Sequence, residues 1–268
     1  MCRLLGYLGE NLQLSQVLCD PEHSLVVQSY EPREMTSGVV NADGYGIGWY
    51  GSRSEKGVES DRPFTYKSLL PIWSDLNLDS LSRYITSDCI LAYVRSATPG
   101  QAIDLSNCQP FVSQTLSYIH NGFIQNFRHT LYRPIRERLS DELYQSIQGS
   151  TDSEHIFALL LHTWQTHPNW TLQQALKATL LELRQLAETH NTRLSANLVL
   201  SDGRSLVASR FASHATAPSL YWIKDDAAFP NAVLIASEPL FPGNWQAFPD
   251  SSLVCVGEDR EFDWYYLD

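Results

Sequence analysis

The second residue of the chain is a cysteine, a residue type that can act as a nucleophile. Cys2 directly follows Met1, and aminopeptidase removal of Met1 would expose it as the first residue. An N-terminal cysteine combines a nucleophile with a base, because an α-amino group with a pKa of about 7.7–8.0 lies beside a thiol with a pKa of about 8.5 and can take its proton near neutral pH. A buried strand cysteine that happens to come second is the alternative interpretation.

An asparagine followed by a glycine is the next candidate. Asn121 and Gly122 come directly after a strand-like run, and glycine tolerates a positive φ, so we expect the chain to turn sharply there. Such a turn would point the Asn121 amide and a backbone N–H in the same direction, and two convergent donors form an oxyanion hole. An ordinary Asn-Gly hairpin turn is the alternative.

Two charged residues could bind the two ends of an amino acid. Arg95 follows a strand-like run over residues 90–94, and an arginine at a strand end can hold a carboxylate through two parallel hydrogen bonds. Asp152 lies in the first turn of a predicted helix and could hold a substrate ammonium group. The alternatives are a surface salt bridge for Arg95 and stabilisation of the helix dipole for Asp152.

The remaining motifs do not indicate a cofactor. Residues 43–48 are rich in glycine, but the spacing differs from that of a dinucleotide-binding loop, and a strand rather than a helix follows. We predict a tight turn that leads into a strand whose glycines let another backbone or a ligand approach closely. The eight histidines show no metal-ligand spacing, and no Cys-x-x-Cys pair occurs, so the sequence predicts no metal and no other cofactor.

Length and composition indicate a single folded domain over residues 2–268. The chain has 268 residues, 43% hydrophobic and 18% charged, which is too apolar for disorder and long enough for a large core. Its 19 basic and 30 acidic residues leave a net charge of −11, so we expect no nucleic-acid or membrane partner. We find no apolar stretch of about 20 residues and no signal peptide. Five cysteines do not form a disulfide framework, so we expect free thiols and a cytoplasmic protein.

Short strands are the first kind of element that must position these residues. Apolar runs bounded by turn-forming residues predict nine strands. They cover residues 3–7, 46–50, 90–94, 116–119, 197–200, 206–209, 220–223, 233–236 and 253–256.

Helices are expected in the middle of the chain. Apolar residues recur at helical spacing within residues 151–190 and predict two successive helices. The residues placed as capping boxes are Thr151 with Glu154 and Thr171 with Gln174. Weaker helical patterns cover residues 75–84 and 136–148. Because strands and helices do not alternate, the pattern predicts an α+β fold with helices packed on largely antiparallel sheets.

The order of the motifs resembles that of a class II glutamine amidotransferase domain, over nearly the whole chain. The residues that carry the resemblance are Cys2, Asp43-Gly44-Tyr45-Gly46, Val94-Arg95-Ser96-Ala97-Thr98, Asn107-Cys108-Gln109-Pro110-Phe111, His120-Asn121-Gly122 and Thr151-Asp152-Ser153-Glu154. The resemblance implies the N-terminal-nucleophile hydrolase fold, a four-layer αββα sandwich with largely antiparallel sheets.

The resemblance also implies a role for each candidate residue. The matches are Cys2 to the nucleophile, Asn121 and Gly122 to the oxyanion hole, Arg95 to the group that binds the glutamyl α-carboxylate, Asp152 to the group that binds its α-ammonium, and Thr98 to a position that lines the glutamine pocket. Tyr93 stands where many relatives have a histidine, which affects the expected loop packing but removes no catalytic group. Residues 107–111 match a segment that braces the site.

The implied activity is hydrolysis of a γ-glutamyl amide, either glutamine or a small γ-glutamyl compound, through a cysteine thioester with release of glutamate. The chain start, the loop after Arg95 and the segment Ala236-Ser237-Glu238-Pro239-Leu240 are similar to stand-alone members of the family. These include the ergothioneine-pathway enzyme that removes glutamate from a γ-glutamyl-cysteinyl sulfoxide, and relatives linked to glutathione degradation.

Three alternatives to this activity stay open. They are cleavage of a non-glutamyl amide, a glutaminase subunit that delivers ammonia to a separate partner enzyme, and a non-catalytic subunit. Arg95 together with Asp152 argues against the first, and retention of Cys2, Asn121 and Asp152 argues against the last. A homo-oligomer also stays open.

Overall fold

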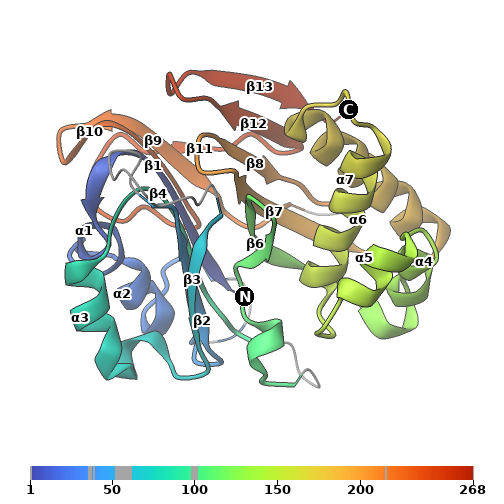
Figure 1. The fold of residues 1–268 in the computed structure, drawn as a ribbon, viewed down its shortest axis with the longest axis horizontal. Helices are drawn as coiled ribbons and strands as arrows, with labels where there is room; N and C mark the ends of the chain where they lie inside the picture. Colours follow the sequence, from blue (N-terminus) through green and yellow to red (C-terminus); the bar gives the residue numbers. More distant parts are fainter. Residues whose placement is uncertain are drawn as a thin grey trace.

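Two antiparallel sheets stack face to face between two layers of helices (Figure 1). The computed structural model describes residues 2–35, 38, 40–51, 62–97, 102–214 and 216–267. The first sheet has seven strands, in the spatial order β11 (Gln246–Ala247), β9 (Tyr221–Asp226), β10 (Phe229–Ala236), β1 (Arg3–Gln13), β4 (Thr86–Val94), β2 (Tyr45–Trp49) and β3 (Phe64–Ser68). The second has six, in the order β13 (Phe262–Tyr266), β12 (Ser252–Val256), β8 (Leu206–Arg210), β7 (Leu194–Ser201), β6 (Leu116–Ile124) and β5 (Phe111–Ser113).

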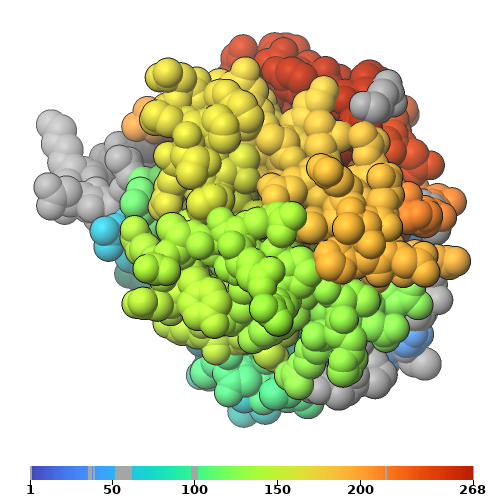
Figure 2. All heavy atoms as spheres, turned by 90° about the vertical axis from the view of Figure 1, so that its right-hand side faces the viewer, coloured from blue at the N-terminus to red at the C-terminus, as the bar shows by residue number. Residues whose placement is uncertain are grey.

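Each sheet has its own helical layer on the outside. The helices against the first sheet are α1 (Ser15–Leu18), α2 (Leu25–Tyr30) and α3 (Leu76–Tyr84), at the left of Figure 1. Those against the second sheet are α4 (Tyr132–Arg136), α5 (Asp141–Ser146), α6 (Asp152–Thr166) and α7 (Leu172–Thr189), and Figure 2 shows this layer, in green and yellow, spread across one face of the molecule. Across the described ranges, none of the helices has the length and apolar character that a membrane span requires.

The core consists of three layers of apolar side chains, one at each interface of the sandwich. Successive residues of a strand point to opposite faces. Accordingly, Leu4 packs between the two sheets with Leu91, Ile119 and Val199, whereas Leu5 packs under the first helical layer. Because β1 and β4 are buried on both faces, they are almost continuously apolar, which is why their sequences predict strands so clearly.

All nine predicted strands are confirmed, and the four that the sequence did not indicate are the four edge strands. These are β3 and β11 in the first sheet and β5 and β13 in the second. Edge strands lack neighbours on one side and expose more surface; Phe64 in β3 is 42% exposed and Tyr266 in β13 is 53% exposed. An apolar run is therefore missing, and the pattern that identifies interior strands fails there.

The predicted helices are confirmed in part. The expected elements over residues 75–84 and 151–190 are α3 and the pair α6 and α7, but residues 136–148 contain the last residue of α4 and the whole of the short helix α5 rather than one helix. Ser140 caps the second of these, α5, and so separates it from α4. The short helices α1 and α2 were not predicted.

The two predicted capping boxes differ in the structure. The box at Thr171 is complete, because its side chain and that of Gln174 each bind the other's backbone N–H. At Thr151 only the first half forms, since the Glu154 carboxylate accepts hydrogen bonds from the backbone of residues 148 and 149 instead. Glu154 therefore holds the loop that precedes α6 rather than the helix cap itself.

Candidate active site

The pairing of β1 with β4 places Cys2 beside the end of β4. Arg3 lies opposite Val94 in the antiparallel register, so the residue before β1 lies against the residues after β4. The Cys2 Sγ accepts hydrogen bonds from the Tyr93 hydroxyl at 2.6 Å and from the Ser96 backbone N–H at 3.3 Å. Two donors therefore converge on the sulfur, and the Ser96 carbonyl oxygen lies 3.5 Å from it as an acceptor for the thiol proton.

Tyr93 is a site residue that the sequence did not identify. Its side chain is buried, and burial, followed by the charge of Cys2, holds the pKa of the phenol well above its ordinary value. The phenol therefore stays protonated and acts as a donor. The sequence analysis treated Tyr93 only as a replacement for the histidine of many relatives, with an effect on loop packing. Its contact with the sulfur depends on its position opposite Leu4 in the strand pairing, which the sequence does not specify.

Asn121 reaches the same region from the second sheet. Its side chain is buried at 1% exposure, and its Nδ2 lies 3.5 Å from the Ser237 Oγ. That hydroxyl oxygen also accepts a hydrogen bond from the Leu4 N–H at 3.0 Å. Through Ser237, the Asn121 amide on the second sheet is thus linked to Leu4 on the first sheet, two residues after Cys2.

Gly122 does not make the sharp turn that the sequence predicts. Strand β6 continues through it to Ile124, paired with β7, and Gly122 is not among the described glycines with positive φ. That prediction was wrong because the pairing with β7 keeps the backbone extended. Glycine is needed for another reason: a Cβ at this position would collide with the carbonyl oxygen of Ser195 and with the His120 ring.

The Gly122 N–H nevertheless points toward the candidate site. The N–H of His120 donates to the Gln109 side chain, and the N–H of Ile124 donates to an Asp152 carboxylate oxygen at 2.7 Å, both on the edge of β6 that faces away from β7. Backbone N–H groups alternate between the two edges along a strand. The Gly122 N–H therefore lies on the same edge as these two, between Gln109 and Asp152.

Arg95 is buried at the end of β4 without an ionic partner. Its side chain is 2% exposed, and its Nη2 donates to the Ala102 carbonyl at 3.1 Å. The Nη1 has no hydrogen-bond partner, and the ion pairs in the described part of the chain do not include Arg95. Asn107 donates to the same carbonyl at 3.0 Å and accepts a hydrogen bond from the Ser150 N–H, so Asn107 and Arg95 hold the same backbone carbonyl.

Asp152 is a buried carboxylate with no cation beside it. It opens α6 behind the capping residue Thr151 and is 7% exposed. Its oxygens accept hydrogen bonds from the N–H groups of Ile124 and Ser153, but it forms no ion pair within the described residues. The charges of Arg95 and Asp152 shift the pKa of Tyr93 in opposite directions, so both charges lie within electrostatic range of the group that contacts Cys2.

The glycine-rich segment over residues 43–48 acts as predicted. Gly44 has φ +104° and leads into β2, and a Cβ at Gly46 or Gly48 would collide with the segment Gln109-Pro110. The glycines therefore admit another backbone, which carries the Gln109 side chain to the edge of β6. Asp43 adds a contact that the sequence did not indicate, because its carboxylate accepts the Ala97 N–H at 2.7 Å and so holds the loop after Arg95.

A buried ionic cluster fixes the start of β1. The Glu238 carboxylate lies 2.7 Å from both the Arg3 guanidinium and the His23 ring, and it accepts the Arg33 N–H. Burial alone would raise the pKa of Glu238, but the hydrogen bonds from His23 and Arg33 and the charge of Arg3 outweigh it and lower the pKa to about 2. Arg3 in turn donates to the Cys2 carbonyl at 2.9 Å, so the cluster limits the movement of the candidate nucleophile.

Comparison with known proteins identifies the family. The sequence profile described as "Glutamine amidotransferases class-II" matches residues 1–238. The chain belongs to the class II glutamine amidotransferase family. It is similar to a probable glutamine amidotransferase of Saccharomyces cerevisiae, with 30% identity over 96% of this chain and 82% of the relative. It is also similar to the gamma-glutamyl-hercynylcysteine sulfoxide hydrolase of Mycolicibacterium smegmatis, with 31% identity over 96% of both chains.

Solved structures support the same assignment. A glutamine aminotransferase class-II domain protein from Silicibacter pomeroyi is similar over the full length of both chains, with a TM-score of 0.70 and 25% identity. The phosphoribosylpyrophosphate amidotransferase of B. subtilis matches the whole of this chain with 49% of its own, at a TM-score of 0.65 and 16% identity, which supports the fold alone. The predicted N-terminal-nucleophile hydrolase fold of this amidotransferase is confirmed.

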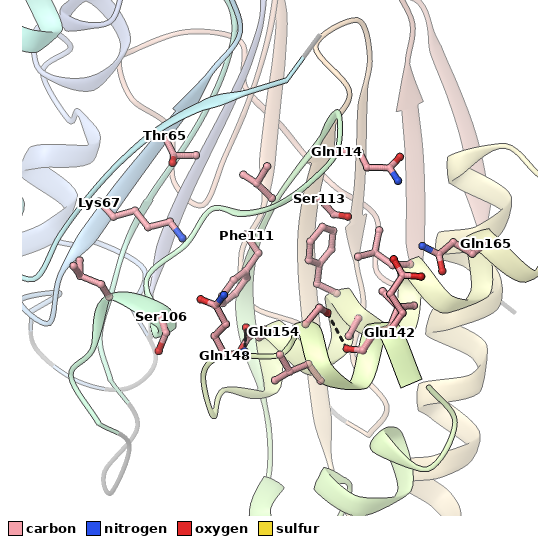
Figure 3. Close-up of a pocket in the computed structure, with 18 residues that line it drawn as sticks. Thr65, Lys67, Ser106, Phe111, Ser113, Gln114, Glu142, Gln148, Glu154 and Gln165 are labelled. Carbon is pink, nitrogen blue, oxygen red and sulfur yellow. Dashed lines mark hydrogen bonds between the residues drawn. The ribbon is translucent and has the colours of Figure 1, made fainter. Parts of the chain in front are cut away.

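A cavity of about 530 Å³ lies elsewhere on this amidotransferase, between β3, β5 and the helices α5 and α6 (Figure 3). The Lys67 ammonium group lies over the Phe111 ring, 5.5 Å from its centroid, and points into the cavity. Burial lowers the pKa of Lys67 and raises that of Glu154, which lines the same cavity. The lining includes Phe111 but none of Cys2, Arg95, Asn121, Gly122 and Asp152.

One predicted site residue cannot be placed. Thr98 lies outside the described residues, so its predicted position at the glutamine pocket stays a prediction. The described ranges hold no group of three or more His, Cys, Asp or Glu side chains arranged to bind a metal ion. The five cysteines all lie in these ranges, and none of them forms a disulfide.

Proposed function

We propose that this class II amidotransferase hydrolyses the γ-amide of a glutamyl group through a thioester on Cys2. The observation that carries the proposal is a pair of buried, opposite charges near the sulfur, Arg95 and Asp152, which form no ion pair among the described residues. A buried charge without an ionic partner is costly, so such a pair is expected to have a ligand that completes it. A free amino-acid head group supplies a carboxylate for Arg95 and an ammonium for Asp152.

The reaction begins at the N-terminus after Met1 is removed. The α-amine of Cys2 takes the thiol proton, and the sulfur is held meanwhile by the donors Tyr93 and Ser96. The thiolate then attacks the γ-carbonyl carbon, and the carbonyl oxygen becomes an oxyanion. The Asn121 amide and the Gly122 N–H are the donors that we assign to this oxygen.

Two proton transfers complete the cycle. The α-ammonium of Cys2 returns its proton to the departing nitrogen as the C–N bond breaks, which leaves a γ-glutamyl thioester and the free amine. The α-amine then takes a proton from water, whose oxygen attacks the thioester carbonyl. The C–S bond breaks, glutamate is released, and the thiol recovers its proton.

The relatives support a substrate of small size. The Mycolicibacterium relative, which matches over nearly its whole length, is named for hydrolysis of a γ-glutamyl-hercynylcysteine sulfoxide. We propose glutamine or a small γ-glutamyl compound as substrate here. The second candidate is a glutaminase subunit that passes ammonia to a separate enzyme, and the glutamine amidotransferase name of the Saccharomyces relative favours it. Five cysteines without a disulfide are consistent with a cytoplasmic setting.

The test uses protein whose loss of Met1 is verified by intact mass. We expect it to release glutamate and amine in equal amounts from γ-glutamyl amides, and to leave α-carboxamide analogues uncut because Arg95 then has no carboxylate to bind. A glutamine-like diazoketone should add one adduct, on Cys2, and Cys2→Ala should abolish turnover while the fold is retained. Activity that appears only after a co-purifying partner is added would favour the subunit function, and no cleavage of any γ-glutamyl amide under either condition would refute the proposal.

Retention of Met1 provides a matched control. An acylated Cys2 nitrogen is an amide and cannot act as the base, so protein that keeps Met1 should be inactive although it contains every side chain of the site. Undiminished turnover by fully Met1-retaining protein would contradict the N-terminal mechanism.

A further inference from the structure

A short chain of polar groups crosses the interface between the two sheets near Cys2. The Leu4 N–H of β1 donates to the Ser237 Oγ at 3.0 Å, and the same oxygen lies 3.5 Å from the Asn121 amide nitrogen of β6. All three residues are buried, with exposed fractions of 0–1%. Polar groups in such a position need partners, because water cannot supply them.

The polar groups of this chain are incompletely paired in the amide orientation that the structure shows. The Ser237 Oγ accepts from the Leu4 N–H and, at the long distance of 3.5 Å, from the Asn121 Nδ2. A serine hydroxyl also has one proton to donate, and no acceptor for that proton lies among the described residues. The Asn121 Oδ1 is buried and has no hydrogen-bond partner in the described part of the protein.

Rotation of the Asn121 amide by 180° about its Cβ–Cγ bond completes the pairing. The two amide atoms exchange places within nearly the same volume. The Ser237 hydroxyl then donates to Oδ1, and Nδ2 with its two protons is directed away from Ser237. In this orientation both Nδ2 protons are available to an oxyanion, whereas in the other orientation one of them is directed at Ser237.

We propose that Ser237 is a positioning residue for the oxyanion hole: its hydroxyl donates to the Asn121 Oδ1 and thereby directs Nδ2 to the reacting carbonyl oxygen. This inference rests on the proposed function, in which Asn121 is an oxyanion donor. Ser237 touches neither the substrate nor the Cys2 sulfur and acts through Asn121.

The surroundings of Ser237 suit this role because its backbone is held on both sides. Its N–H donates to the Leu4 carbonyl at 3.1 Å, and its own carbonyl accepts from the Ser219 hydroxyl at 2.8 Å. Leu4 is two residues from Cys2 on β1. A single serine therefore fixes the Asn121 amide relative to the strand that carries the nucleophile, although the two lie on different sheets.

The kinetic test is a double-mutant cycle in Met1-free protein. We expect Ser237→Ala to lower kcat roughly tenfold, because an incorrectly oriented amide loses part of the 10²–10³-fold effect of an oxyanion donor, and to leave KM within about twofold. In an Asn121→Ala background the same serine change should have no further effect on kcat, because Ser237 acts through the missing amide. Equal losses in both backgrounds would overturn the proposal.

Ser219→Ala is the matched control. It deletes one hydroxyl that bonds to the backbone of Ser237 and leaves the Ser237 hydroxyl in place, so kcat should stay within about twofold of wild type. If Ser219→Ala lowers kcat as much as Ser237→Ala does, the loss of kcat results from general destabilisation of this segment, and the proposal is overturned.

Neutron diffraction from crystals exchanged into D₂O tests the orientation without any assay. We expect the Ser237 deuteron to point at the Asn121 oxygen and the ND₂ group to point away from Ser237. An ND₂ group directed at the Ser237 Oγ would overturn the inference whether or not the enzyme cleaves γ-glutamyl amides. An inactive wild-type protein with the expected deuteron positions would instead contradict the proposed function and leave only the inferred amide orientation supported.

Discussion

Replacement of Tyr93 by phenylalanine removes one hydroxyl group from the sulfur of Cys2 and keeps the ring that packs between the sheets. The deleted hydrogen bond is 2.6 Å long and lies in a buried site. The sulfur keeps its second donor, the Ser96 N–H at 3.3 Å. The variant therefore isolates the electrostatic contribution of one donor.

The size of the effect follows from the energy of a hydrogen bond to a charged group, about 1.5–3 kcal/mol. Each 1.36 kcal/mol corresponds to about a tenfold change in rate. The neutral thiol also accepts the bond weakly, so only part of this energy is lost, and we expect Tyr93→Phe to slow alkylation of Cys2 about tenfold near neutral pH.

The assay is the rate of inactivation by a small alkylating agent near neutral pH, with the adduct located on Cys2 by mass spectrometry. Thermal denaturation of wild type and Tyr93→Phe is measured beside it, so that a lower rate cannot result from a loss of fold.

Tyr118→Phe is the control for loss of a buried phenol hydroxyl. Tyr118 stacks on Phe157 under the second helical layer, and its hydroxyl has no hydrogen-bond partner among the described residues. This change should leave the alkylation rate of Cys2 unchanged. An unchanged rate in Tyr93→Phe, or an equal loss of rate in Tyr118→Phe, would show that the hydrogen bond to the sulfur is not the cause and would refute the reasoning.

Three further changes test the parts that surround the sulfur. Gly122→Ala places a Cβ against the Ser195 carbonyl, so thermal denaturation should show about 1–3 kcal/mol of destabilisation; an unchanged melting temperature would contradict this steric argument. The pKa of Glu238 is lowered to about 2 from 4.5, so its ionised form contributes stability above about pH 4.5 that is lost as the pH falls toward 2. We therefore compare the unfolding free energies of wild type and Glu238→Gln in urea titrations. The difference should be on the order of 3 kcal/mol near neutral pH and should shrink between pH 4.5 and 2. A difference that stays constant over this pH range would contradict the role of the Glu238 charge. Arg95→Lys should raise KM with little change in kcat, because lysine cannot form two parallel hydrogen bonds to a carboxylate; an equal KM would place the α-carboxylate elsewhere.

Much of the local structure could be predicted from the sequence because it depends on neighbours along the chain. Interior strands such as β1 and β4 are apolar on both faces, and α7 begins at a capping box that Thr171 completes. The four edge strands could not be predicted, since what makes them strands is a partner on one side and not their own apolar pattern. The expected turn at Gly122 failed for a related reason: its conformation is set by pairing with β7.

The sequence by itself determined which reacting groups this protein has and in what order they occur, from Cys2 through Arg95 and Asn121 to Asp152. It could do so because residue types and short spacings are local properties. What the tertiary structure alone decided is how these groups meet. The register of β1 against β4 brings the Tyr93 hydroxyl onto the Cys2 sulfur, and the stacking of the sheets brings Asn121 to Ser237. Folding also buries the opposite charges of Arg95 and Asp152 without an ion pair to any described residue. Register and stacking result from contacts between segments far apart in the chain, and no local pattern contains them.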